Sequence, residues 1–103
     1  MTNKEKLEAL KAFLNENNVK FVENYYSKTA KLTLDVLIKD LRIAVHLSDG
    51  HDQTFYKSVF MLYKPFFIRE SETVDFVIEK MQNCIYDRMM LMQRRMEKNN
   101  RKG

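Results

Sequence analysis

Leu32-Thr33-Leu34-Asp35-Val36-Leu37-Ile38 is the stretch that decides the fold, together with Arg42-Ile43-Ala44-Val45-His46-Leu47-Ser48 after it. In both stretches apolar side chains recur at every second position, which is the repeat of a β-strand with one face on a core. The first stretch is expected to turn four apolar side chains to the same face: Leu32, Leu34, Val36 and Ile38. The short polar link Lys39-Asp40 predicts a tight turn between two antiparallel strands, and this pairing brings Asp35 beside His46.

The segments around this hairpin alternate between helix and strand patterns. The expected elements are a helix over 4–16, strands over 19–26, 31–38 and 42–48, a helix over 53–63 that ends at Lys64-Pro65, a strand over 66–69 and a helix over 72–99. The order is αβββαβα. It predicts an α+β fold with a small mixed sheet of three to four strands, flanking helices and a long C-terminal helix.

Length and composition bound the kind of protein. A chain of 103 residues with 45% hydrophobic and 31% charged residues is enough for one small domain. We expect this domain over 1–87 and a basic helical extension and tail over 88–103. Cys84 is the single cysteine, which excludes a disulfide or a multi-thiolate metal site within the chain. No stretch is apolar enough to cross a bilayer, so a cytoplasmic location without membrane partners is expected.

The positive charge is concentrated at the C-terminal end. Residues 88–103 hold six basic side chains and one acidic side chain, a net +5, whereas the rest of the chain holds 12 basic and 13 acidic side chains, a net −1. Such a segment can attract DNA or RNA. The expected contacts are Arg88, Arg94, Arg95 and Lys98. A solvated helix end whose cations complement the helix dipole is the preferred interpretation of the segment itself, because so short a tail gives only weak, nonspecific DNA binding.

Two further patterns suggest partners. The last helix carries an apolar stripe that a small sheet is too short to cover, with Met89, Met92 and Met96 in its distal half. We expect this stripe to meet a second copy in a homodimer; a helix that projects or folds back along the first helix is the alternative. Aromatic residues also interleave with lysines, as in Tyr56-Lys57 and Tyr63-Lys64. They could stack on single-stranded bases, although a core role is preferred.

The element order and three local segments resemble the PD-(D/E)xK nuclease superfamily, in particular its small very-short-patch-repair-like branch. The segments are Leu34-Asp35-Val36 with Ile38, Leu41–His51, and Phe67-Ile68-Arg69-Glu70 leading into the last helix; the resemblance in topology spans residues 4–85. It implies a restriction-endonuclease-like fold. In that family an acid on the first hairpin strand, and an acid and a lysine on the second, serve a divalent metal that activates water. Asp35 matches the first acid, whereas His46 and Ser48 stand at the other two positions.

The resemblance therefore implies a nuclease fold that has lost cleavage, because one Asp and one His lack the oxygen ligands that Mg²⁺ prefers. We expect a noncatalytic binding or regulatory module with weak nucleic-acid affinity, no cofactor and no metal. The alternatives are a metal-dependent nuclease using Asp35 and His46, and a protein-interaction module that dimerises through the C-terminal helix. A zinc or manganese site could gather Asp35, His46, Asp49, His51 and Asp52, but loop capping by Asp49 and Asp52 is preferred.

Overall fold

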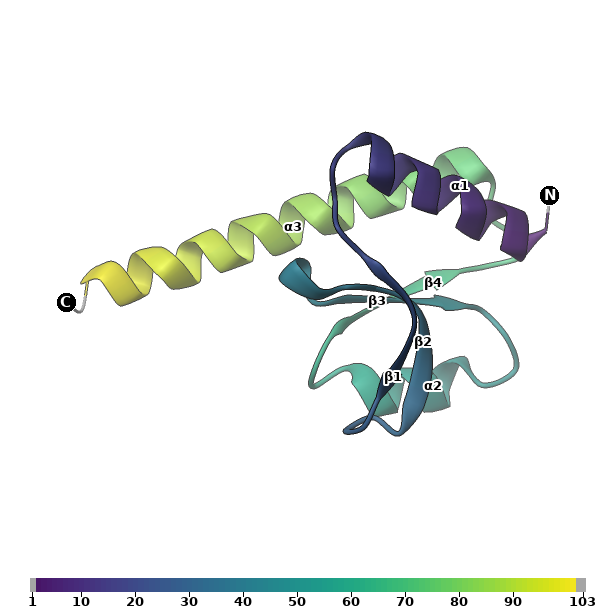
Figure 1. Cartoon of the computed structure of the whole chain (residues 1–103), viewed down its shortest axis with the longest axis horizontal. Helices are drawn as coiled ribbons and strands as arrows, with labels where there is room; N and C mark the ends of the chain where they lie inside the picture. Colours follow the sequence, from purple (N-terminus) through teal and green to yellow (C-terminus); the bar gives the residue numbers. More distant parts are fainter. Residues whose placement is uncertain (1, 102–103) are drawn as a thin grey trace.

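The computed structural model describes residues 2–101, with side chains described for residues 2–97 (Figure 1). It confirms the α+β class and the αβββαβα order. The elements are α1 (Asn3–Glu16), β1 (Val22–Ser27), β2 (Leu32–Ile38), the 3₁₀ helix η1 (Lys39–Leu41), β3 (Ile43–Leu47), α2 (Asp52–Val59), β4 (Lys64–Ile68) and α3 (Val74–Arg101).

The four strands form one mixed sheet in the order β1-β2-β3-β4. The pairs β1–β2 and β2–β3 are antiparallel, whereas β3 and β4 are parallel because α2 connects them. Helices α1 and α3 cover one face of the sheet and α2 covers the other (Figure 1). The chain thus has three layers and two apolar cores, one on each side of the sheet.

Both cores consist of the apolar side chains that the strand and helix patterns place inward. The larger core lies under α1 and α3 and buries Leu7, Leu10, Leu14, Val36, Ile38, Ile43, Val45, Phe66, Ile68, Val77 and Met81. The smaller core lies under α2 and buries Leu34, Leu37, Ala44, Phe55 and Val59. Burial of this apolar surface is the main favourable contribution to folding.

The expected alternation of β2 is wrong at Leu32 and Leu34. Leu34 is buried in the core under α2 and Leu32 packs against that core, whereas Val36 and Ile38 lie under α1 and α3. Between β1 and β2, Glu23 pairs with Val36 and Tyr25 pairs with Leu34. Asn24 and Asp35, which lie between these pairs, are not paired. Asn24 has a left-handed backbone with φ 49°, a conformation that Asn tolerates better than most residues. We attribute the exchange of faces along β2 to this interruption.

The segment between α2 and β4 also differs from the expectation. Helix α2 ends at Val59 instead of residue 63, and β4 already begins at Lys64. The N–H groups of Leu62 and Tyr63 both donate to the Val59 carbonyl, at 2.9 and 2.8 Å, and close a compact turn. Pro65 does not break the strand, because β4 is an edge strand and needs hydrogen bonds on one side only.

Helix α1 is fixed to the sheet by a buried lysine. The Lys6 side chain is only 2% exposed. Its Nζ donates to the carbonyls of Arg69 and Glu70 at 2.8 and 2.9 Å. The ammonium group therefore satisfies two carbonyls of the link between β4 and α3, although the sequence pattern places Lys6 on the polar side of the helix.

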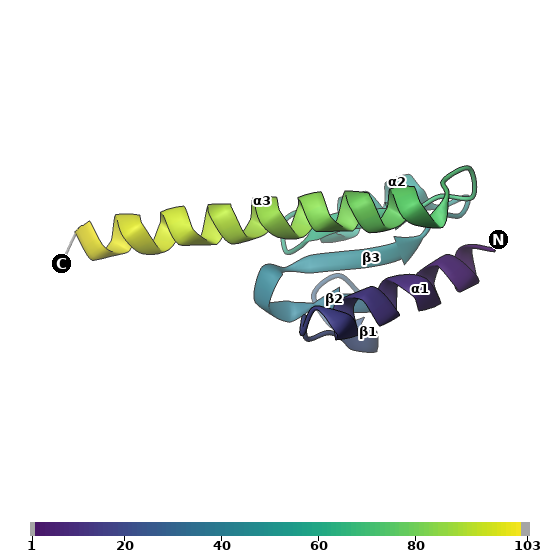
Figure 2. The same ribbon diagram turned by 90° about the horizontal axis from the view of Figure 1, so that it is seen from above.

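Helix α3 crosses the expected domain boundary at 87/88 without a break. Val77 and Met81 are fully buried at its N-terminal half, where α1 lies beside it. Its C-terminal half extends past the sheet (Figure 2), in a molecule that measures 50 × 30 × 20 Å. The helix thus projects and does not fold back along α1. Among the described residues, no helix combines the length and the apolar character needed to cross a membrane.

Candidate functional site

Asp35 and His46 are neighbours, as the hairpin register predicts. The regular pairing of β2 with β3 ends at Val36 and Val45. Asp35 and His46 follow directly after this pair, and His46 Nδ1 lies 3.8 Å from Asp35 Oδ2. The same carboxylate oxygen accepts a hydrogen bond of 3.2 Å from the Leu47 N–H. Asp35 thus satisfies a backbone donor at the point where the ladder between the two strands ends.

His46 is a packed side chain. Its ring stacks on Phe55 of α2 with a centroid distance of 4.2 Å and an angle of 14°. The ring also meets the edge of Phe67 at 6.0 Å. Stacking on one aromatic ring and edge contact with a second fix the orientation of the imidazole. The residue at the expected position of a catalytic acid is therefore part of the core under α2.

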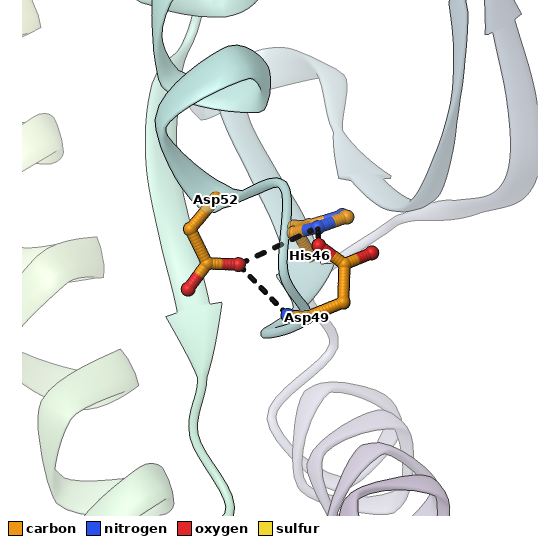
Figure 3. A group of neighbouring side chains, drawn as sticks. All are labelled: His46, Asp49 and Asp52. Carbon is orange, nitrogen blue, oxygen red and sulfur yellow. Dashed lines mark hydrogen bonds and ion pairs between the residues drawn. The ribbon is translucent and has the colours of Figure 1, made fainter.

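The second ring nitrogen of His46 faces two carboxylates (Figure 3). Nε2 lies 3.5 Å from Asp49 Oδ1 and 3.8 Å from Asp52 Oδ1. This nitrogen is buried and has no hydrogen-bond partner among the described residues. His46, Asp49 and Asp52 have ligand atoms within 4.8 Å of one another. His51, which the sequence analysis grouped with them, is exposed and contributes its backbone N–H to Asp49 Oδ1.

The two carboxylates bind hydrogen-bond donors within the loop, in line with the preferred loop role, but no side chain in the described part of the chain caps the N-terminus of α2. Asp52 Oδ1 accepts from the Asp49 N–H at 2.8 Å, and Asp52 Oδ2 accepts from the Ser48 hydroxyl. The hydrogen bond from the His51 N–H holds the pKa of Asp49 below its usual value. Burial opposes ionisation of Asp52, but the hydrogen bonds from Ser48 and Asp49 outweigh it and also lower the pKa of Asp52. Both groups are therefore ionised near neutral pH and stabilise the loop that precedes α2.

The metal that the nuclease resemblance implies does not fit Asp35 and His46. Mg²⁺ requires several oxygen ligands, whereas this pair offers one carboxylate, already bound to the Leu47 N–H, and one imidazole. The mixed set of His46, Asp49 and Asp52 could instead hold Zn²⁺ or Mn²⁺. Ser48 and backbone N–H groups also donate hydrogen bonds to both aspartates, and these bonds contribute to the shape of the loop.

A second site lies at the other end of β3 and α2. It is an open pocket of about 530 Å³, which we call the basic pocket. Its walls come from the start of β3, from the segment between α2 and β4, and from α3. The lining residues are Arg42, Tyr56, Phe60, Met61, Leu62, Tyr63, Lys64, Pro65, Arg88 and Arg95. Four are cationic, and no acidic residue is among the described residues that line it.

Backbone contacts position three of the cations. Arg42 has a left-handed backbone with φ 55° that ends η1, and its carbonyl accepts from the Lys64 N–H at 2.6 Å. Parallel pairing of β3 with β4 thus places Arg42 and Lys64 side by side. Arg88 Nε donates to the Leu41 carbonyl at 2.8 Å. Its two terminal nitrogens keep their N–H groups for another acceptor.

Two of the four basic residues predicted to bind nucleic acid lie in this pocket. Arg88 and Arg95 are seven residues apart on α3 and share one face of the helix. Arg94 is exposed and is not among the residues that line the pocket. The side chain of Lys98 lies outside the described residues. The sequence analysis missed Arg42, and it named Lys64 only as a lysine next to an aromatic residue that could bind single-stranded bases. The parallel pairing of β3 with β4 brings these two residues together.

Two aromatic side chains complete the pocket. Tyr56 and Phe60 stack on each other with centroids 5.5 Å apart and an angle of 2°. They are 49% and 48% exposed, which distinguishes them from the buried Phe55 one residue earlier. A parallel pair of half-exposed rings leaves apolar faces open to a planar ligand.

The chain therefore carries two sites at opposite ends of β3 and α2. The Asp35–His46 site is engaged in hydrogen bonds and packing, whereas the basic pocket presents four cations that form no salt bridge among the described residues, and two half-exposed aromatic side chains. Comparison of the chain with protein families, curated proteins and solved structures finds no match.

Proposed function

We propose that this chain is a noncatalytic binding module that attaches to nucleic acid through the basic pocket, to which the basic end of α3 contributes Arg88 and Arg95. The observation that carries the proposal is the convergence of Arg42, Lys64, Arg88 and Arg95 from three separate segments without a lining acid. Cations held together repel one another, and an anionic ligand relieves that repulsion. Phosphate suits this pocket because guanidinium groups bind its oxygens with paired hydrogen bonds.

The proposal includes a restriction-endonuclease-like fold without cleavage. The αβββαβα order, the mixed sheet and the adjacency of Asp35 and His46 support the fold. The histidine at the expected position of the second acid, and the stacking of its ring on Phe55, support the loss of cleavage. We also infer a cytoplasmic location, where the single thiol of Cys84 stays reduced. Burial raises the pKa of this thiol and lowers its reactivity.

A pair of adjacent arginines gives the matched test. Arg95→Gln removes one charge from the basic pocket, whereas Arg94→Gln removes the same charge from an exposed position outside it. Binding of a fluorescent 12-nucleotide strand at low salt should weaken clearly more in Arg95→Gln than in Arg94→Gln. If the unchanged protein does not bind a single strand or a duplex at low salt, the proposal is wrong.

A protein-interaction module is the second candidate. Tyr86, Met89 and Met96 are large apolar side chains exposed on the projecting α3, and exposed apolar groups of this kind occur at contacts between proteins. Sedimentation measurements over a range of concentrations test this candidate. A stable dimer that Met89→Lys dissociates, and that ignores nucleic acid, would favour the interaction module over the nucleic-acid module.

A further inference from the structure

The basic pocket combines two kinds of side chain, and this combination points to the form of its ligand. The guanidinium groups of Arg42, Arg88 and Arg95 and the stacked rings of Tyr56 and Phe60 line the same pocket. A duplex presents phosphates to such a surface but hides the faces of its bases in the stack. An unpaired nucleotide presents both a phosphate and an open base face.

Resting on the proposed function, we propose that the basic pocket selects single-stranded nucleic acid. An unpaired base extends the Tyr56–Phe60 stack, and the phosphates beside it bind Arg42, Arg88 and Arg95. The volume of about 530 Å³ is in the range of pockets that enclose small organic ligands. Because every base has a π face, this recognition tolerates different sequences.

The aromatic pair is suited to stacking by its position. Tyr56 and Phe60 are four residues apart, so they lie on one face of the chain at the end of α2. Their rings are parallel to within 2°, and about half of each side chain is exposed. A base added to this pair covers apolar surface without moving the core, whereas Phe55 and Phe66 are buried and offer no face.

The cations are suited to the phosphates next to that base. Arg88 is oriented by its hydrogen bond to the Leu41 carbonyl. Arg95 lies two helical turns further along the same face of α3. Arg42 reaches the pocket from a different element, at the start of β3. The three guanidinium groups therefore come from two separate segments of the chain and can bind successive phosphates of a flexible strand.

Three probes of equal length separate base from phosphate: a dT₁₂ strand, a 12-unit abasic strand and a 12-base-pair duplex. At the same salt concentration, the unchanged protein should bind dT₁₂ at least about fivefold more tightly than the abasic strand, since stacking of one base contributes about that much. A double variant that carries both Tyr56→Ala and Phe60→Ala should bind dT₁₂ and the abasic strand with equal affinity. Tyr26→Ala, which changes a similarly exposed tyrosine on β1, should keep the difference.

A second variant reports the contact directly. The chain has no tryptophan, so Tyr56→Trp places a single tryptophan, which can be excited selectively, in the aromatic pair while keeping an aromatic ring there. Its emission should be quenched by dT₁₂ but not by the abasic strand. Equal affinity of the unchanged protein for all three probes, without quenching in Tyr56→Trp, would overturn the single-strand inference and leave the proposed function intact. Failure to bind any of the three probes at low salt would contradict both the single-strand inference and the proposed function.

Discussion

Replacement of Arg95 by Gln tests whether the cations of the basic pocket act on phosphates. Four cationic side chains line the pocket. If each neutralises one phosphate of a single strand, log K should fall with log salt with a slope of about −2.8, because each contact contributes about −0.7. Arg95→Gln leaves three contacts and a slope of about −2.1. Between 50 and 200 mM salt the affinity should therefore fall about 50-fold in the unchanged protein and about 20-fold in the variant.

The assay is fluorescence anisotropy of labelled dT₁₂ at five salt concentrations from 50 to 200 mM. Arg94→Gln is the control, because it changes the net charge by the same amount at the adjacent exposed position. Its slope should stay near about −2.8. Equal slopes for Arg94→Gln and Arg95→Gln would refute the reasoning, since they would show that diffuse charge along α3 binds the strand and the pocket does not.

Three further substitutions test the rest of the structure. Lys6→Met removes the buried ammonium from two carbonyls and should lower the free energy of unfolding in urea by about 2–4 kcal/mol, whereas the exposed Lys4→Met should change it little. Burial raises the pKa of Glu72, but hydrogen bonds led by Lys80 outweigh it and hold the pKa below the usual 4.5; this stabilisation is present above about pH 4.5 and lost as the pH falls below it. The loss of stability in Glu72→Gln should therefore shrink from pH 6 to pH 3, and a constant loss would contradict the assignment. His46→Phe keeps the aromatic stack and should change the unfolding free energy by less than about 1.5 kcal/mol and leave nucleic-acid affinity unchanged; a large change in either shows that His46 is more than a packing residue.

Local sequence patterns were sufficient for the class and the order of elements. Alternation in β2 and β3 predicted the hairpin, and that hairpin correctly placed Asp35 beside His46. The face of Leu34 could not be predicted in this way, because it depends on the left-handed backbone of Asn24 on a different strand. The role of Pro65 was missed for a similar reason: its tolerance in β4 depends on the strand lying at the edge of the sheet.

Only some of the cationic residues that line the basic pocket could be predicted from the sequence. Arg88 and Arg95 belong to a charged segment that composition alone identifies. Arg42 and Lys64 are single basic residues at strand starts, and they reach the pocket only through the parallel pairing of β3 with β4. Tyr56 resembles other aromatic residues in the sequence, and only the early end of α2 shows that it is exposed beside Phe60.

The most direct test of nucleic-acid binding at the basic pocket is an NMR titration of the ¹⁵N-labelled chain with unlabelled dT₁₂ at low salt. We predict that amide shifts change most around residues 42, 56, 60–65, 88 and 95, the segments that line the pocket. The loop and strand ends around Asp35, His46 and Asp52 should change little. Shifts centred on that second group, or no shifts at any ratio of strand to protein, would contradict the assignment of nucleic-acid binding to the basic pocket.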